Sequence, residues 1–281
     1  MGIVKVAVVI PVHNGAATLA ATLDNLLQQT LADISITVVE NASTDETVRV
    51  AQEFCDRDDR VSIDIGTTLL PPLENFSRAM RIGAAKGEYF VLRACDDVST
   101  LDYLEVLAEA LDSQPECQMA AGKTKLVAGP KGERFKTPHP NVFNFRDSYE
   151  SGRVPRNLTF PAEWIYGMFR SETVDRLQAR WRELETPWCS ASYAVYDFVL
   201  QDQVAYVPDT YYIFAEGSGS DKTYGAKGFR AQLKRRLDYC LGCFALRHDL
   251  PPVSPVTTVR FFLMCWADSR RKTGYKMLGF L

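Results

Sequence analysis

The feature that most constrains the fold is a regular alternation of apolar, strand-like segments and amphipathic, helix-like segments over residues 1–127. Short apolar runs predict strands at 4–10, 34–39, 61–65, 89–92 and 119–127. Between them, apolar side chains recur at helical spacing, as Leu19, Leu23 and Leu26 do. Strands that alternate with helices normally pair in parallel. The sequence therefore predicts an α/β protein with a parallel sheet flanked by helices.

Residues at the ends of these segments predict where each element begins or ends. Pro11 is expected to end the first strand, because proline cannot donate a ladder hydrogen bond. Ser43 and Glu46 stand three residues apart, a capping-box pattern that predicts the start of a helix at Ser43. Gly87 is expected to end the helix predicted over 73–86.

The alternation stops after about residue 128. Residues 128–160 are rich in Pro, Gly, Asn and charged side chains, which predicts a long loop region of functional importance. Two short strands are expected at 204–207 and 211–214, followed by a flexible hinge at 217–220. We therefore divide the chain into an α/β half at 1–127, a second half of the same domain at 128–220, and a helical C-terminal extension at 221–281.

The composition is that of a soluble globular protein, with 46% hydrophobic residues and a formal net charge of −3. No apolar run approaches the roughly 18 residues of a membrane span, and Met1 leads directly into the first strand without a signal peptide. The seven cysteines are scattered through apolar segments and do not form a disulfide framework. These features predict a cytoplasmic protein.

The charge is unevenly distributed along the chain. Residues 222–281 contain twelve Lys and Arg against three Asp, a balance of +9, so the preceding 221 residues carry −12. Such asymmetry indicates that the basic C-terminal segment faces an anionic partner, such as the inner face of a membrane. The alternative is a solvated helical face. The segment lacks the interleaved aromatic residues of a single-strand binder, so no nucleic-acid partner is expected.

Two adjacent carboxylates, Asp96 and Asp97, follow the strand predicted at 89–92. In an open α/β sheet, ligands bind outside the carboxyl ends of the strands. A carboxylate pair at that edge can hold a hard divalent cation, which in turn binds phosphate oxygens. The alternative is that the two acids cap the next helix.

Other motifs are incomplete. No Gly-x-Gly-x-x-Gly follows the first strand, so a dinucleotide site is not expected. Cys240 and Cys243 supply only half of the ligands of a zinc site, and their spacing is more typical of two neighbours on one helix face. The three histidines have no spacing suited to a metal triad.

Three blocks in a fixed order carry a resemblance to a known family. They are Val8-Val9-Ile10-Pro11-Val12-His13-Asn14-Gly15, then Val38-Val39-Glu40-Asn41-Ala42-Ser43-Thr44-Asp45, then Gly87 to Asp97. With these blocks, the chain resembles a family 2 glycosyltransferase of the GT-A fold, which implies a mixed, mostly parallel sheet flanked by helices. The resemblance is strong over residues 3–125 and weaker over 160–215.

This resemblance implies an inverting transfer of a sugar from a nucleoside-diphosphate sugar to an acceptor hydroxyl, with Mn²⁺ or Mg²⁺. Residues 1–127 are then the nucleotide-sugar-binding half and residues 128–220 the acceptor side. The implied nucleotide-sugar contacts are Pro11, His13, Asn14, Glu40, Arg78 and Asp96, with Asp96 and Asp97 at the metal. For Asn14 the alternative is a turn former, and for Arg78 a solvated helix face. Trp164 and Tyr166 read as core residues or as a platform for a sugar ring.

Two positions depart from the family pattern. The first Asp of the metal-binding block is Ala94 here. Either Asp97 or Arg93 compensates for its loss, or the metal binds more weakly. The general base that an inverting displacement requires is usually an Asp, but Ala191-Ser192 stand at the corresponding place. Asp197 is the nearest acid downstream and Glu185 the nearest upstream, and the alternative for both is a surface residue without a catalytic role. Of the two we predict Asp197 as the base.

The resemblance and the basic segment together imply a glycan or lipid-linked acceptor, as in the synthesis of cell-surface polysaccharide or glycolipid. One alternative is a degenerate family member that binds a nucleotide sugar or glycan without turnover. A second is a nucleotidyltransferase, although Val12-His13-Asn14-Gly15 lacks the glycine-rich basic loop expected of that class.

Overall fold

The structure is a computed structural model that describes residues 2–127, 133–184, 187–215 and 228–273. The chain divides into two compact units. The first unit comprises Met1–Lys136, Glu163–Gln178 and Val204–Ser218. The second unit comprises Thr137–Ala162, Ala179–Gln203 and Gly219–Leu281. The units therefore interleave along the chain, whereas the division made from the sequence has three successive segments.

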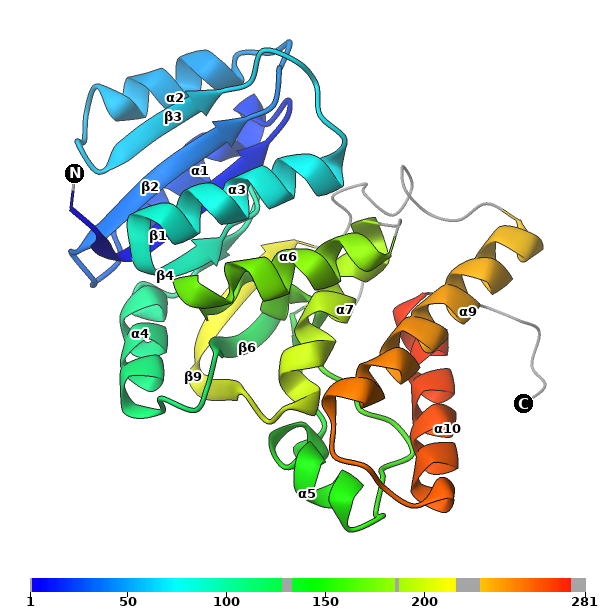
Figure 1. Ribbon diagram of the computed structural model, residues 1–281. Helices are drawn as coiled ribbons and strands as arrows, with labels where there is room; N and C mark the ends of the chain where they lie inside the picture. Colours follow the sequence, from blue (N-terminus) through cyan, green and yellow to red (C-terminus); the bar gives the residue numbers. More distant parts are fainter. Residues whose placement is uncertain (1, 128–132, 185–186, 216–227, 274–281) are drawn as a thin grey trace. The chain divides into compact units, whose positions relative to one another are not determined.

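The first unit is built on one mixed sheet (Figure 1). Its strands are β1 (Val4–Val12), β2 (Ile34–Glu40), β3 (Val61–Ile65), β4 (Gly87–Leu92), β5 (Val98–Ser99), β6 (Met119–Val127), β7 (Arg134–Lys136), β8 (Met168–Arg170) and β9 (Val204–Ala215). The order is β3-β2-β1-β4-β8-β6-β9-β5, with β7 paired to β6. Strands β3, β2, β1 and β4 pair in parallel, as do β6 and β9, while β8 is antiparallel to its neighbours. The predicted mixed, mostly parallel sheet is confirmed.

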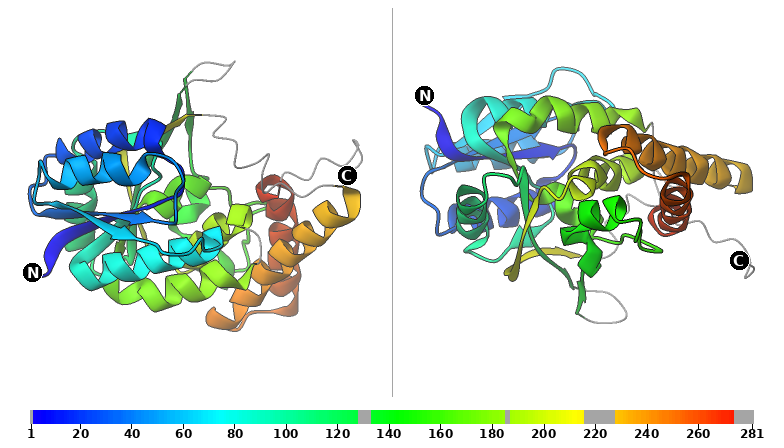
Figure 2. Two further views of the ribbon diagram at one scale, coloured as in Figure 1. Left: turned by 90° about the horizontal axis from the view of Figure 1, so that it is seen from above. Right: turned by 60° about the horizontal axis from the view of Figure 1, so that its bottom comes forward.

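Helices cover both faces of this sheet (Figures 1 and 2). They are α1 (Ala16–Leu27), α2 (Thr47–Cys55), α3 (Pro72–Lys86) and α4 (Tyr103–Ser113). Helices α1, α2 and α4 bury their apolar stripes against one face, in a core that includes Val8 and Leu23. Helix α3 lies on the opposite face, where a Cβ on Gly83 would stand 3.0 Å from Phe90 Cβ. The strand–helix alternation read from the sequence thus produces a sheet buried on both sides.

Two predicted boundaries in the first unit are wrong. Strand β1 does not end at Pro11 but continues to Val12, with the buried Pro11 opposite Val39 of β2. Helix α2 begins at Thr47 rather than at Ser43, because Asp45 Oδ1 accepts the Thr47 N–H at 3.0 Å. Pairing with β2 thus overrides the local effect of Pro11, whereas the start of α2 depends on a local contact between residues two apart.

The two short strands predicted at 204–207 and 211–214 form one continuous strand, β9. Its pairing with β6 shifts register, so that Val207 lies opposite Gly122 and Tyr211 lies opposite Lys123. Pro208, Asp209 and the next residue are accommodated by this irregularity rather than by a turn. The hinge predicted at 217–220 lies outside the described residues.

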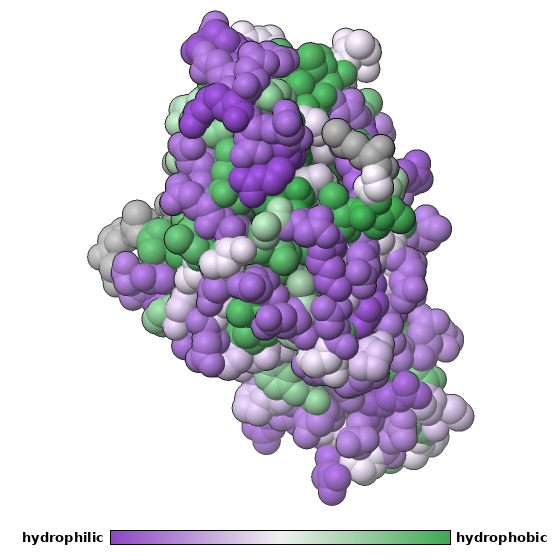
Figure 3. All heavy atoms as spheres, turned by 90° about the vertical axis from the view of Figure 1, so that its left-hand side faces the viewer, coloured by the Kyte–Doolittle hydropathy of each residue, from purple (hydrophilic) through white to green (hydrophobic). Residues whose placement is uncertain are grey.

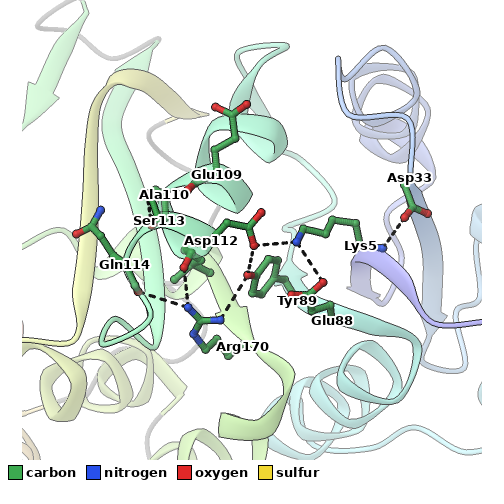
Figure 4. Close-up of polar contacts among 11 residues, drawn as sticks. Lys5, Asp33, Glu88, Tyr89, Glu109, Ala110, Asp112, Ser113, Gln114 and Arg170 are labelled. Atoms are coloured by element: carbon green, nitrogen blue, oxygen red, sulfur yellow. Dashed lines mark hydrogen bonds and ion pairs between the residues drawn. The ribbon is translucent and has the colours of Figure 1, made fainter.

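A polar network joins β1, β4, α4 and β8 at the amino ends of the parallel strands (Figure 4). Lys5 Nζ forms ion pairs with Glu88 at 3.1 Å and with Asp112 at 2.8 Å. The Tyr89 hydroxyl donates to Asp112 at 2.6 Å and accepts from Arg170 at 3.4 Å. Burial and the bond to Asp112 raise the pKa of Tyr89 to about 12, so this hydroxyl remains protonated. The network ties together the sheet edge opposite the carboxyl ends of the parallel strands.

The second unit is mainly helical. Its helices include α5 (Phe145–Glu150), part of α6 (Val174–Glu183), α7 (Pro187–Leu200), α9 (Phe229–Ala245) and α10 (Pro255–Lys272), with 3₁₀ turns at Pro140–Phe143 and Leu246–Asp249. The fully buried Asp268 of α10 accepts the Leu158 N–H at 3.0 Å and the Tyr196 hydroxyl at 2.8 Å. The prediction of a helical C-terminal segment is confirmed for residues 229–272, and the region predicted as a loop contains α5 and a 3₁₀ turn.

All seven cysteines carry free thiols. Among the residues that the structure describes, no helix combines the length and the apolar composition required to cross a bilayer. The face of the molecule in Figure 3 carries hydrophilic side chains interspersed with smaller hydrophobic groups.

Candidate functional site

The candidate site lies where three neighbouring parallel strands end. Strands β2, β1 and β4 are adjacent and parallel, so their carboxyl ends meet at one edge of the sheet. The loops that follow begin at His13, Asn41 and Arg93. Pro11 is buried within β1, and it is the exposed His13 and Asn14 that extend beyond the strand. The fold therefore gathers three sequence-predicted segments at the edge where α/β sheets bind ligands.

The loops after β1 and β2 are hydrogen-bonded to each other. His13 Nδ1 donates to the Asn41 carbonyl at 2.9 Å. The Asn14 N–H donates to Ser43 Oγ at 3.0 Å, and Asn14 Oδ1 accepts the Thr44 N–H at 2.8 Å. Asn14 has a φ of 55°, in the left-handed region that asparagine tolerates better than most residues. Asn14 therefore acts as a turn former whose side chain shapes the edge.

Glu40 and Arg78 hold the loops after β2 and β3. The Glu40 side chain is 1% exposed; its carboxylate accepts the Ser43 N–H and, at 3.3 Å, the Gly66 N–H. Arg78 Nη1 donates to the Glu40 carbonyl at 3.1 Å, and its Nη2 pairs with Asp64 Oδ1 at 2.5 Å. Both predicted contact residues thus lie just behind the edge and determine the shape of its loops.

The loop after β1 also comes close to the loop after β4. A Cβ on Gly15 would lie 2.5 Å from Val12 Cγ2 and 3.1 Å from Cys95 Sγ. A Cβ at this position would clash with Val12 and crowd Cys95, so glycine favours this close approach. The close contact brings the start of α1 beside the segment that carries Asp96 and Asp97.

Asp96 and Asp97 differ sharply in environment. Asp96 is exposed, and its carboxylate has no hydrogen bond or ion pair with any residue that the structure describes. Asp97 is 8% exposed, and its Oδ2 accepts the Tyr212 hydroxyl at 2.6 Å. Burial raises the pKa of Asp97 to about 7; the Tyr212 hydrogen bond opposes the increase, and the charge of Asp96 adds to it. Asp96 is therefore the carboxylate available to a ligand, and Asp97 is held within the protein.

Arg93 is a fully buried cation next to this pair. Its guanidinium lies 5.4 Å from the ring centroid of Tyr103 and 5.1 Å from that of Tyr212. Nη2 donates to Ser99 Oγ at 3.1 Å, whereas Nε and Nη1 have no partner within the described ranges. Its positive charge acts to lower the pKa of Asp97. Arg93 therefore places a positive charge beside Asp97, and a guanidinium has no oxygen that could replace the carboxylate ligand absent at Ala94.

Aromatic and charged side chains from several segments of the first unit lie near Asp97. The Tyr166 and Tyr212 rings stack with centroids 5.1 Å apart. The charges of Asp97 and Glu163 both act on the Tyr166 hydroxyl, whose pKa burial raises well above its ordinary value. Glu163 Oε1 pairs with Lys136 Nζ at 2.6 Å. The sequence analysis missed Glu163, Lys136 and Tyr212, because no local motif marks them.

Trp164, which the sequence left as either a core residue or a sugar platform, is 2% exposed and belongs to the core.

The residues at this edge fit a divalent cation that binds together with a ligand. No group of three or more metal-binding side chains occurs within the described ranges, so the chain does not form a closed metal cage there. Mg²⁺ in enzymes often uses one or two carboxylates and takes its other ligands from substrate phosphates and water. The exposed Asp96 meets this requirement. A cation at this site would therefore depend on a phosphate-bearing ligand.

Asp197, the predicted general base, lies in the second unit. It is 1% exposed, and its Oδ2 accepts a hydrogen bond from Arg180 Nε at 3.1 Å. Arg180 also pairs with Glu183 at 2.7 Å and with Asp249 at 2.6 Å. The first unit thus brings together His13, Asn14, Glu40, Asp96 and Asp97, and Asp197 belongs to a separate ion-pair network.

Sequence comparison gives one family and two relatives. The model of Glycosyl transferase family 2 matches residues 7–204. Glycosyltransferase GlyG of Streptococcus pneumoniae serotype 4 is 27% identical over 109 residues, which are 39% of this chain and 36% of GlyG. Glycosyltransferase GlyA of the same organism is 33% identical over 107 residues, 37% of this chain and 14% of GlyA. The chain thus matches well under half the length of either relative.

Two solved structures share the fold. TarS 1-349 of S. aureus in complex with UDP-GlcNAc has a TM-score of 0.64 at 15% identity, over 95% of this chain and 72% of that one. The mannosyltransferase PcManGT of Pyrobaculum calidifontis in complex with GDP-Man and Mn²⁺ has a TM-score of 0.57 at 16% identity, over 97% and 72%. These likenesses confirm the GT-A fold expected from the sequence. Since the family model covers well over half of the chain, including all three strand-end loops of the candidate site, the protein belongs to glycosyl transferase family 2.

Proposed function

We propose that this protein is a metal-dependent, inverting glycosyltransferase that moves a sugar from a nucleoside-diphosphate sugar to an acceptor hydroxyl. The observation that carries the proposal is the exposed Asp96 carboxylate at the edge where β1, β2 and β4 end. Two proteins of the same fold support it, since TarS was solved with UDP-GlcNAc and PcManGT with GDP-Man and Mn²⁺.

In this proposal the three loops at the edge bind the donor. Asp96 would hold Mn²⁺ or Mg²⁺, which supplies positive charge to the diphosphate as it leaves. His13 and Asn14 line the nucleotide end, where their contacts with the loop after β2 preorganise the edge. Glu40 shapes the region proposed to read the base, and Asp97 supports Asp96 from a buried position. Arg78 contributes to donor binding by holding the loops after β2 and β3 in place.

The general base of the proposed reaction is Asp197. In the structure its carboxylate is buried and accepts a hydrogen bond from Arg180, so it must become accessible before it can take the acceptor's proton. Replacement of Asp197 is therefore the decisive test for this part of the proposal.

The proposed acceptor is a glycan or a lipid-linked precursor of cell-surface polysaccharide or glycolipid, met at the cytoplasmic face of a membrane. The support is the balance of +9 in residues 222–281, which suits an anionic surface.

A second candidate is a degenerate family member that binds a nucleotide sugar or glycan without turnover. Ala94, which leaves the edge one carboxylate short, and the ion pair that engages Asp197 favour it. An active enzyme slowly hydrolyses its donor in the absence of acceptor, whereas a binding protein releases no free sugar. Measurement of sugar release from UDP- and GDP-sugars therefore separates the two candidates.

The donor site is tested by thermal unfolding with UDP, GDP, dTDP and CDP, each with and without Mn²⁺. A ligand that binds only the folded state at 100 times its Kd adds about 2.7 kcal/mol to the free energy of unfolding. One nucleotide is expected to stabilise the protein with Mn²⁺, and Asp96→Asn is expected to remove the effect of the metal. Asp59→Asn, another exposed carboxylate of the first unit, is the matched control. If no nucleotide shifts the unfolding temperature, the donor-site assignment is wrong.

A further inference from the structure

The last two helices of the described chain form an antiparallel pair within the second unit (Figures 1 and 2). Phe244 of α9 packs against Phe262 of α10, with ring centroids 5.2 Å apart. Closer to the start of α9, Arg236 stacks on Trp266 at 3.7 Å and donates to Ser269 Oγ at 3.3 Å. These contacts place the first half of α9 beside the last half of α10.

Each helix of the pair has an exposed apolar stripe. On α10, Val256, Val259 and Leu263 recur at i, i+3 and i+7 and are 61%, 59% and 56% exposed. On α9, Leu237 and Leu241 are four residues apart and are 40% and 55% exposed. Residues three, four or seven apart lie on one side of a helix. We call these five side chains the outer apolar stripe.

Both helices bury their opposite side against other residues of the second unit. On α10 the fully buried Phe261 packs against Phe145 and Tyr149 of the same unit. On α9 the buried Tyr239 donates to Ser192 Oγ of α7 at 3.2 Å. Since both helices bury this side into the unit, the outer apolar stripe faces outward from the pair.

Basic side chains continue the same stripes. Arg230 and Lys234 precede Leu237 and Leu241 by seven residues, and Arg270 follows Leu263 by seven. All three are exposed, and the antiparallel packing puts them at one end of the pair. We call these three residues the basic cluster. Over the two helices, the exposed side chains include five cations and one acid, Asp238.

We propose that this face of α9 and α10 docks onto an anionic lipid bilayer. Five exposed aliphatic side chains beside a basic cluster have the character of an interfacial amphipathic surface, in which apolar groups enter the acyl boundary and cations meet lipid phosphates. A bilayer complements both parts. A second copy of the chain would bring the same basic cluster and no complementary anionic group on this face. The proposal gives the proposed transferase a membrane as its partner. It rests on the proposed function in one respect only, which is that docking brings the enzyme to a lipid-linked acceptor.

The test is sedimentation of the full chain with vesicles of phosphatidylcholine alone and of phosphatidylcholine with phosphatidylglycerol. Binding to the anionic vesicles only is expected. It should weaken as salt increases from about 0.1 M to about 1 M, because the Debye length falls from about 10 Å to about 3 Å. Absence of binding to anionic vesicles, or equal binding to both vesicle types, overturns the proposal.

Two pairs of substitutions test the two parts of the surface. Val259→Ser with Leu263→Ser is expected to weaken vesicle binding at least about tenfold, through loss of buried apolar area. Arg230→Ser with Lys234→Ser is expected to weaken it about fivefold for each charge removed. Ile3→Ser with Arg57→Ser, which removes an exposed apolar and an exposed basic side chain from the first unit, is the matched control. If the control loses as much binding as either pair, the assignment of the surface is wrong.

Light scattering in solution separates the bilayer from a second copy of the chain. The proposal expects the same mass for wild type and for Val259→Ser with Leu263→Ser. A wild-type dimer that this pair of substitutions dissociates would show that the face binds another copy, and would overturn the proposal. Nucleotide-dependent thermal stabilisation is measured on the same preparations. Loss of vesicle binding with intact nucleotide stabilisation therefore refutes the docking surface alone.

Discussion

The hydroxyl of Tyr212 donates a 2.6 Å hydrogen bond to Oδ2 of Asp97, which joins β9 to the loop after β4 across 115 residues of sequence. This bond engages one of two adjacent carboxylates and leaves Asp96 exposed beside it. Which of the two carboxylates is buried and which is exposed to a ligand therefore depends on Tyr212, a residue far away in the chain.

The titration of Asp97 is expected to make the metal-free protein less stable as the pH increases. Because the folded state has the higher pKa, about 7 against an ordinary value of 3.8, folding favours the protonated form. The resulting penalty is absent below about pH 4 and complete above about pH 7, at most roughly 4 kcal/mol. In EDTA, the stability of Asp97→Asn relative to wild type should therefore increase over this range in urea unfolding. A difference that is independent of pH would contradict the assignment.

Tyr212→Phe is expected to move this titration to higher pH. The hydrogen bond stabilises the charged form of Asp97, so its loss raises the pKa of Asp97 above about 7, while the ring stacked on Tyr166 remains. The midpoint of the pH-dependent stability difference reports the change. Tyr211→Phe, on the neighbouring position of β9, is the control, since no hydrogen bond links Tyr211 to Asp97. An unchanged midpoint in Tyr212→Phe would show that the bond does not control Asp97.

Ala94→Asp is expected to increase affinity for Mn²⁺ in the absence of nucleotide. The substitution places a third carboxylate next to Asp96, whereas the wild type offers one exposed carboxylate and is expected to bind the cation only weakly alone. Calorimetric titration with Mn²⁺ measures the difference, and Ala85→Asp, at an exposed position of α3, controls for the added charge. Equal affinity in the two variants would mean that position 94 is not directed toward the cation.

Asp197→Asn is expected to reduce kcat by about 10²–10⁴ if Asp197 is the general base, with nucleotide binding unchanged. Asp249→Asn is the matched control, because Asp249 pairs with the same Arg180 at 2.6 Å but its side chain is 51% exposed. A variant that keeps its turnover and loses thermal stability would assign Asp197 to the ion-pair network instead.

Glu40→Ala is expected to lower the free energy of unfolding by about 1–3 kcal/mol, because the Ser43 N–H loses its acceptor at a buried position. Glu40→Gln keeps an acceptor oxygen and should retain most of that stability. If Glu40 reads the base as proposed, Glu40→Gln also changes the order of preference among UDP, GDP, dTDP and CDP. The same order of nucleotide preference in wild type and Glu40→Gln would show that Glu40 only supports the loops.

The sequence by itself determined the sheet strands around β1, the helices that cover them, and the sheet edge at which the candidate site lies. Apolar runs and helical periodicity are local patterns, and parallel strands necessarily bring their carboxyl ends, with His13, Glu40 and Asp96, to one edge. The three spaced blocks also identified the family, which the match over residues 7–204 confirms.

Only the tertiary structure decided how the carboxylates of the chain differ. Asp96 and Asp97 are adjacent and chemically identical in the sequence, yet one is exposed and the other is buried against Tyr212 and Arg93. Asp197 lies in α7, and its hydrogen bond from Arg180 cannot be inferred from sequence spacing. Burial and pairing depend on residues brought together from distant parts of the chain, and these contacts determine which charge a carboxylate carries and whether a ligand can reach it.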